Sequence, residues 1–381
     1  MNKTIVKTVT LLLMMTLMGI TAQKTAAQKK EVPSYLKGYE ELYAKNPHAA
    51  AIQWHKDAKF GLFIHYCLGS MIPVTAEMAK EAKAQSKEAW QELRSSHIQT
   101  VGKYFNEFTA ENFDANFITE LALSAGMKYI NFTTRHIGEL NMWDTKTSDY
   151  NSMKAPARRD LVRELAEQCR KKGLGLFLYV PPDVAKTEPE ERYQKNRAIL
   201  TELLSNYGDI AGIWFDGNTY YYADPEAYTR TRELYALIKK LQPQCLVSFK
   251  QGMGGEDFSA PEFMMYGMKG TLAQAAWAAN KDKWGDICAN MQYDPDSWLY
   301  MDGCKHFTAD QLWELLSKAF GQNANLTINI APLPDGTVHP DDVKTFVEIG
   351  NRIRKEGYPP PYITENKKEY MPIEWREKNK P

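Results

Sequence analysis

The feature that most constrains this chain is a regular alternation of short apolar runs and amphipathic segments. Apolar runs typical of buried strands begin at residues 127, 174, 210 and 245, so successive starts are 47, 36 and 35 residues apart. Helical periodicity fills most of the intervals. This spacing indicates βα units, whose right-handed crossovers build either an open doubly wound sheet or a closed (β/α)8 barrel.

The remaining elements follow from the same two patterns. We expect further strands over 59–66 and 326–330, and helices over 113–124, 159–172, 190–206, 225–241, 308–320 and 341–355. Residues 76–98, rich in Ala, Lys, Glu and Gln, predict one long helix inserted over the end of the first strand. No Gly-x-Gly-x-x-Gly follows a strand and no P-loop signature is present, which disfavours nucleotide binding.

The first 27 residues have the composition of a secretory signal peptide. Lys3 and Lys7 precede an apolar run over 9–20, and small residues follow it. We therefore expect cleavage between residues 22 and 28 and a secreted or periplasmic protein. The apolar run is too short to span a bilayer, and no later segment approaches the roughly 20 apolar residues that a spanning helix needs.

The rest of the chain has the length of one large domain. We expect residues 28–358 to form the barrel. Residues 359–381 begin with three prolines and are rich in charge, so they predict an irregular tail and not a second globular domain. The sequence leaves the oligomeric state open.

Charge and cysteine content narrow the possible partners. The chain has 47 acidic and 47 basic residues without a long basic run, which argues against nucleic acid. The five cysteines lack the paired short spacing of a zinc site, and we expect neither a metal nor another cofactor. Cys67, Cys169 and Cys245 lie in apolar or helical contexts and are expected to be buried thiols.

A carboxylate ends one of the apolar runs. Residues 208–217 read Gly-Asp-Ile-Ala-Gly-Ile-Trp-Phe-Asp-Gly. Because carboxyl ends of parallel strands open onto active sites, Asp216 is a candidate catalytic residue, with a helix or turn cap as the alternative. Other polar residues end neighbouring strands: His65, Arg135, His136, Tyr179 and Lys250. If the barrel closes, these side chains meet Asp216 at one mouth.

Cleavage of a glycosidic bond requires a second carboxylate. Candidates lie in the irregular stretch 254–263, after the fifth strand. Glu262 is 46 residues beyond Asp216 and would reach the site from the adjoining unit, and Glu256 is the fallback. A solvated loop carboxylate is the alternative for Glu262.

Taken together, residues 54–340 resemble the α-L-fucosidases of glycoside hydrolase family 29. The matching motifs are Lys59 to His65, Phe108 to Asp114, Ala125 to Tyr129, Thr133 to His136, Trp143 to Lys146, Arg159 to Val162, Trp214 to Gly217 and Asn325 to Gly336. The resemblance implies a (β/α)8 TIM-like barrel. It also implies an enzyme that releases terminal α-L-fucose from a glycan with retention, through a covalent glycosyl-enzyme.

The resemblance also implies roles for individual residues. Asp216 would be the nucleophile and Glu262 the acid/base. His65, His136 and Tyr179 match residues that contact the sugar or line its pocket. Lys250 is a further candidate for substrate binding, and Trp284 is expected near the pocket rim.

Four departures from the family pattern bear on the choice of sugar. Ile137 replaces a second histidine, and the loss of a donor to a sugar hydroxyl changes discrimination between substrates. Lys250 stands where one branch of the family has Arg, and it lacks the bidentate geometry of a guanidinium. Residues 76–98 replace the usual aromatic segment, and we expect no C-terminal β-sandwich. A related sugar such as an α-L-galactoside is therefore an alternative substrate.

Two other functions compete with this hypothesis. The altered histidine pair is compatible with a catalytically silent relative that binds glycans. A metal-dependent barrel hydrolase is the other possibility, because His65, His136, Glu139 and Asp216 are residue types that ligate divalent ions. Sensitivity of the activity to a chelator distinguishes a metal enzyme from a glycosidase that uses two carboxylates.

Overall fold

A computed structural model of the chain describes residues 31–181, 188–216, 225–249, 255–260, 283–295 and 297–363. The chain divides into two compact units, Met1–Pro33 and Ser34–Pro381, and the fold below is that of the second unit. In this part of the chain no helix is long and apolar enough to cross a membrane. Lys250 and Glu262 lie outside the described residues.

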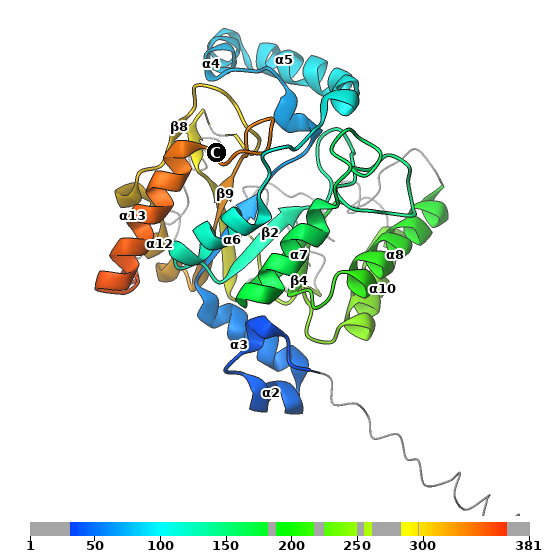
Figure 1. The fold of residues 1–381 in the computed structure, drawn as a ribbon, viewed down its shortest axis with the longest axis vertical. Coiled ribbons are helices and arrows are strands. Elements are labelled where there is room, and N and C mark those ends of the chain that lie inside the picture. Colours follow the sequence, from blue (N-terminus) through cyan, green and yellow to red (C-terminus); the bar gives the residue numbers. More distant parts are fainter. Residues whose placement is uncertain are drawn as a thin grey trace, which may run out of the picture. The chain divides into compact units, whose positions relative to one another are not determined.

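Helices and strands alternate through the central part of the described chain, from α6 to β5 (Figure 1). The helices are α2 (Glu40–Lys45), α3 (Pro47–Ala58), α4 (Ala76–Gln85), α5 (Lys87–Thr100), α6 (Ala115–Ser124), α7 (Leu161–Lys172), α8 (Pro189–Asn206), α10 (Pro225–Leu241), α12 (Ala309–Gly321) and α13 (Pro340–Glu356), with 3-10 turns η1 (Ser34–Leu36), η2 (Leu68–Met71) and η3 (Val101–Glu107). The strands are β1 (Phe60–Ile64), β2 (Tyr129–Thr133), β3 (Gly175–Val180), β4 (Gly212–Phe215), β5 (Leu246–Phe249), β6 (Gly285–Asn290), β7 (Gln292–Asp294), β8 (Lys305–His306) and β9 (Ala324–Ile330).

Capping residues fix several helix boundaries. Asp114 accepts a hydrogen bond from the backbone N–H of Phe117 at the start of α6, and Asp160 does the same for Arg163 in α7. Helix α7 ends at Gly173, whose φ of 71° lies in the left-handed region that favours glycine. These signals explain why both helices match the sequence-based expectation to within two residues.

Seven parallel strands form one sheet in the order β5-β4-β3-β2-β1-β9-β6. Every residue of these strands is buried, which accounts for the continuous apolar runs in most of them. Strand β1 pairs with β2 on one side and β9 on the other, so the first and last strands of the barrel are neighbours. The α/β fold predicted from the repeat is confirmed.

Residues 257–260 complete the ring between β5 and β6. The backbone N–H of Asp257 donates to the Val247 oxygen of β5 at 2.7 Å. On the other side, Ser259 donates to the Trp284 oxygen at 3.0 Å and accepts from the Asp286 N–H at 2.8 Å, and it bridges Gly285 in parallel. The segment therefore takes the place of the remaining strand of a TIM-like barrel.

The structure of this region differs from the expectation from sequence. Residues 257–260 were expected to be an irregular loop, and β6 was not expected at all. The reason is composition, since β6 reads Gly-Asp-Ile-Cys-Ala-Asn and has no continuous apolar run. Its six residues are nevertheless buried, and Asp286 finds polar partners inside the barrel.

Aromatic rings fill the amino end of the barrel. The indole of Trp54 in α3 stacks on Phe177 with centroids 6.3 Å apart and meets Tyr129 edge-on. A Cβ at position 175 would lie 2.3 Å from Trp54 Cη2, so close packing requires Gly175 at the start of β3. Figure 1 shows α2 and α3 at this end and α4 and α5 at the opposite one.

The helical insertion after β1 is a hairpin, and the prediction of one long helix over 76–98 is wrong. Ser86 has extended backbone and ends α4, while its side chain accepts from the Ala89 N–H at 3.0 Å to begin α5. A small apolar cluster that includes Val74, Ala79 and Met301 packs the hairpin onto the barrel.

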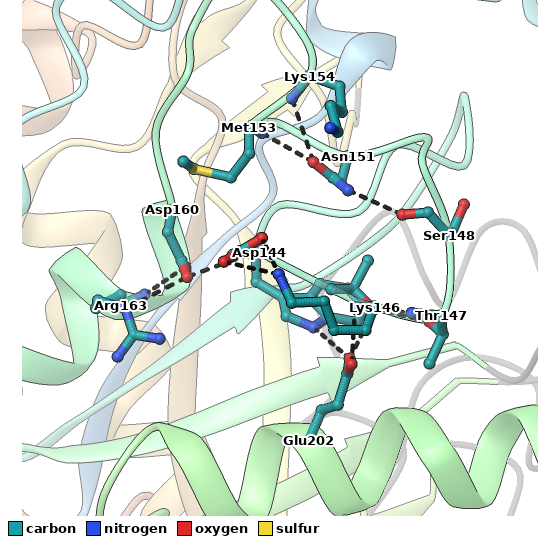
Figure 2. Close-up of polar contacts among 12 residues, drawn as sticks. Asp144, Lys146, Thr147, Ser148, Asn151, Met153, Lys154, Asp160, Arg163 and Glu202 are labelled. Carbon is teal, nitrogen blue, oxygen red and sulfur yellow. Dashed lines mark hydrogen bonds and ion pairs between the residues drawn. The ribbon is translucent and has the colours of Figure 1, made fainter.

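Hydrogen bonds join the long loop after β2 to α8 (Figure 2). Glu202 of α8 accepts hydrogen bonds from Thr145 Oγ1 at 2.6 Å and from the Lys146 N–H at 2.7 Å. Asp160 accepts from the Asp144 N–H at 3.2 Å. The Trp143 to Lys146 motif thus holds a loop in place, and this loop begins next to His136.

Candidate active site

A pocket of roughly 610 Å³ opens at the carboxyl ends of the strands. Asp216, directly after β4, and His136, which follows β2, contribute to its lining. Most of the remaining wall comes from η2 and the residues after it, the loop over 297–301 and the α4–α5 hairpin, together with Ile137. Carboxyl strand ends are where barrel enzymes place their active sites.

Tyr179 orients the carboxylate of Asp216. The Tyr179 hydroxyl donates a hydrogen bond to Asp216 Oδ2 at 2.7 Å. Strand register sets this contact, because Tyr179 of β3 lies beside Trp214 of β4 and their rings stack 5.6 Å apart. Asp216 is half-buried, so its carboxylate is held in one orientation while it lines the pocket.

His65 follows β1 and is held by Asn329 of the neighbouring strand β9. Asn329 Oδ1 accepts from the His65 backbone N–H at 3.2 Å and lies 2.7 Å from Nδ1. The Asn329 amide donates to Asn290 Oδ1 and to the Trp298 oxygen, which fixes its orientation. Nδ1 of His65 is therefore the donor in this contact.

His136 stands beside His65 and Tyr179. Its ring centroid lies 5.0 Å from that of His65 and 5.6 Å from that of Tyr179. Arg135 turns away instead, because its guanidinium donates to the Pro181 oxygen at 3.0 Å and pairs with Glu139. The structure thus brings His65, His136, Tyr179 and Asp216 together.

Ile137 makes part of the pocket wall apolar. It lies against η2, where a Cβ on Gly69 would come within 3.0 Å of Ile137 Cβ and 2.5 Å of Leu299 Cδ1. Both Ile137 and Leu299 line the pocket. The position that holds a histidine in the family pattern therefore contributes a hydrocarbon surface.

Trp298 is an aromatic residue of the site that the sequence analysis missed. Its ring centroid lies 4.8 Å from that of His65, and it lines the pocket. The signal that could have found it is its place after the carboxyl end of β6, but that strand was not recognised.

Two expected site residues lie at the amino end of the barrel. Trp284 directly precedes β6, and its indole N–H donates to His55 Nδ1 at 3.0 Å. Glu256 precedes the 257–260 segment and is 2% exposed, with Oε1 accepting from Tyr235 of α10 at 2.7 Å. The structure does not bring Trp284 or Glu256 to the pocket.

The donor set proposed for a metal does not assemble. Within the described ranges, no three His, Cys, Asp or Glu side chains are placed to hold a metal ion. Glu139 forms an ion pair with Arg135.

Three of the cysteines are buried thiols, as predicted. Burial raises the pKa of Cys67, Cys169 and Cys245 to about 12.

This fold and pocket define a class: TIM-like barrels with a substrate pocket where the parallel strands end. Within this class, the chain belongs to the alpha-L-fucosidase family, whose profile matches residues 23–358.

Several relatives of known name are similar to the chain. A putative alpha-L-fucosidase of Caenorhabditis elegans is 25% identical over 324 residues, which are 78% of this chain and 64% of that protein. Alpha-L-fucosidase 1 of Arabidopsis thaliana is 23% identical over 64% of this chain and 52% of its own length. The chain thus spans less than two thirds of both curated relatives.

Solved structures share the fold. Alpha-L-fucosidase isoenzyme 1 from Paenibacillus thiaminolyticus superposes with a TM-score of 0.66 at 23% identity, over 84% of this chain and 80% of that one. Alpha-L-fucosidase AlfC from Lactobacillus casei, solved with α-L-fucose product, has a TM-score of 0.61 at 23% identity, over 80% of this chain and 98% of its own.

Proposed function

We propose that this protein hydrolyses terminal α-L-fucosides with retention of configuration. The observation that carries the proposal is the 2.7 Å hydrogen bond from Tyr179 to Asp216 within a pocket at the carboxyl end of the barrel. A fixed carboxylate in such a pocket can attack an anomeric carbon. Membership of the alpha-L-fucosidase family supports the choice of sugar.

In the first step, Asp216 forms a bond to the anomeric carbon as the glycosidic C–O bond breaks. The hydrogen bond from Tyr179 to Oδ2 holds the Asp216 carboxylate in place for this attack. We propose Glu262, two residues beyond the described segment 255–260, as the acid that gives its proton to the departing oxygen. Glu256 is disfavoured for this role because it is buried against α10.

In the second step, the carboxylate of Glu262 takes a proton from water. The water oxygen bonds to the anomeric carbon and the bond to Asp216 breaks, so one water is consumed and the enzyme is restored. Two displacements at the same carbon give net retention. The His65 ring, which Asn329 holds beside His136, is suited to contact the sugar.

The apolar wall supports fucose over its 6-hydroxylated counterpart. Ile137, Leu299 and Trp298 present hydrocarbon and ring surface to the pocket. A wall of this kind suits the C6 methyl group of fucose. Apolar pockets reject an added hydroxyl only by about 100-fold, so slow turnover of α-L-galactosides is expected.

The test is release of phenol from an aryl α-L-fucoside and from the matching α-L-galactoside, with NMR detection of the anomer formed first. We expect faster turnover of the fucoside, α-L-fucose as first product, and no turnover by Asp216→Asn. An initial β-anomer would overturn the retaining mechanism.

A second candidate function is glycan binding without catalysis. Ile137 favours it, because this position supplies no hydrogen bond to a sugar hydroxyl. Wild-type protein that binds fucosylated glycans in calorimetry but turns over neither aryl glycoside would establish this alternative.

We further propose that the protein is exported. The signal-peptide pattern occupies residues 1–27, and the compact unit that contains the barrel begins only at Ser34. Amino-terminal sequencing of protein from the native host should give a start between residues 22 and 28. A start at Met1 would contradict export by cleavage.

A further inference from the structure

The pocket has a wall that plays no part in the proposed reaction. Lys87, Trp90, Arg94, His97 and Ile98 of α5 line it. Their spacing of three, four, three and one residues places them on one side of a helix. The insertion therefore turns a single, continuous face toward the pocket.

This face is strongly basic. Lys87 and Arg94 of α5 and Lys83 of α4 line the pocket, whereas its lining contains one carboxylate, that of Asp216. The acidic residues of α5, Glu88 and Glu92, lie off this face. We call Lys83, Lys87 and Arg94 the basic face.

Two members of the basic face lack a counter-ion. Across the part of the chain that the structure describes, neither Lys87 nor Arg94 forms an ion pair or hydrogen bond, and both are exposed. Lys83 lies 4.8 Å from the ring centroid of Trp90. Cations next to a pocket raise the local concentration of anions and supply charge-assisted hydrogen bonds.

The position of the basic face indicates which part of a substrate it meets. Asp216 and His136 mark the strand-end side of the pocket, where the reacting sugar binds in the proposed function. Helix α5, which has no buried residue, forms the outer wall. A group bound there is attached to the reacting sugar from the solvent side, so it belongs to the leaving group.

We propose that the basic face binds a sulfate or carboxylate on the leaving-group sugar. The substrate class is then acidic fucosylated glycans. This inference rests on the proposed fucosidase function but concerns a different group of residues. Trp90 offers a ring on which the same sugar can stack.

The experiment compares α-L-fucosides whose leaving sugar is glucose, glucose 6-sulfate or glucuronic acid, which differ only at C6. Each of the three is tested with a (1→2), a (1→3) and a (1→4) linkage, and comparisons are made within one linkage. We expect kcat/KM for an anionic member to exceed that of the neutral one by about three- to tenfold, because exposed ion pairs each contribute a small factor. Preference for sulfate or for carboxylate identifies the source of the charge.

Charge variants locate the effect. The ratio of anionic to neutral kcat/KM should fall to about one in Lys87→Gln/Arg94→Gln and below one in Lys87→Glu/Arg94→Glu. Lys171→Gln, which removes an exposed cation from α7, should leave the ratio unchanged. In wild-type protein, about 1 M salt should abolish the preference, because the screening length falls to about 3 Å.

The outcomes separate the two proposals. Turnover of the neutral fucoside without any anionic preference overturns the acidic-glycan inference and leaves the fucosidase function standing. If no fucoside is turned over, the fucosidase function fails. Calorimetry with the same disaccharides then decides the inference, since equal affinity for neutral and anionic members would overturn it.

Discussion

At the carboxyl end of the barrel Tyr179 donates a 2.7 Å hydrogen bond to Asp216, and at the amino end Tyr235 donates one of the same length to Glu256. Asp216 is half-buried and lines a pocket, whereas Glu256 is 2% exposed and packs beneath α10. A tyrosine–carboxylate pair thus lines a pocket at one end of the barrel and is packed in the interior at the other.

A wider network of buried polar side chains at the amino end is likewise hydrogen-bonded internally. Asp286 accepts hydrogen bonds from Tyr129 at 2.9 Å and from Thr327, and His55 Nε2 lies 3.3 Å away. Burial, together with Asp286, raises the pKa of Tyr129 well above its ordinary value. Polar groups that satisfy one another in this way are not free to bind substrate.

The sharpest test of the comparison is a matched pair of Asp→Asn changes. Asp216→Asn should lower kcat by about 10⁴-fold or more without changing the urea midpoint, because Asp216 is the proposed nucleophile. Asp286→Asn should instead lower the free energy of unfolding by about 2–4 kcal/mol, because an amide cannot accept all of its hydrogen bonds. Loss of kcat at unchanged stability in Asp286→Asn would break the comparison.

A second pair tests the two glutamates. Glu262→Gln should lower kcat by about 10²- to 10⁴-fold for leaving groups that need a proton, and far less for an activated phenol. Glu256→Gln should leave the activity of folded protein intact. Identical leaving-group dependence in the two variants would contradict the assignment of Glu262.

Two tyrosine variants make the smallest chemical change. Tyr179→Phe removes the hydrogen bond to Asp216 and should lower kcat by about 10- to 100-fold, since bonds to charged groups contribute about 1.5–3 kcal/mol. Tyr235→Phe removes the equivalent bond to Glu256 and should lower stability by a similar free energy. Steady-state kinetics and urea unfolding of both variants check this, and the comparison fails if Tyr235→Phe reduces kcat alone.

The smallest effect concerns the pH dependence of stability at the amino end. Burial alone would raise the pKa of Asp257, but His48 at 2.7 Å and Lys239 outweigh it and lower this pKa. A carboxyl whose pKa is lower in the folded than in the unfolded protein stabilises the fold at pH values above its unfolded pKa of about 3.9. This contribution is lost as the pH falls through the folded pKa.

Lys239→Met should therefore destabilise the protein by about 1 kcal/mol at pH 6 and by less at pH 3, measured by urea unfolding at both values. Activity at pH 6 should not change. An equal loss at both pH values would assign Lys239 a packing role and not an electrostatic one.

That His65, Tyr179 and Asp216 lie together could be predicted from the sequence for a physical reason. His65 and Asp216 each directly follow a buried apolar run, and Tyr179 lies within another. Parallel pairing aligns the ends of such runs, so residues far apart in sequence converge. Asn329, which orients His65, was predicted only as part of a family motif because its contact depends on the register between β1 and β9.

The errors have an equally local cause. Trp284 directly precedes β6 and Trp298 follows β6 and β7, so which of them reaches the pocket depends on where these strands lie. Without a continuous apolar run the strand was not recognised, so Trp284 was assigned to the wrong end. The break at Ser86 was missed because serine is compatible with a helix interior as well as with a cap.

The α4–α5 hairpin packs against the barrel through a small apolar cluster around Val74, Ala79 and Met301 that is separate from the main core. Substitutions at exposed α5 residues that line the pocket, such as Lys87 and Arg94, therefore need not disturb the main core of the barrel. Substitutions on this one face of α5 can change which glycans are accepted while the residues at the strand ends stay the same. The insertion also offers engineers a place to graft new glycan preferences.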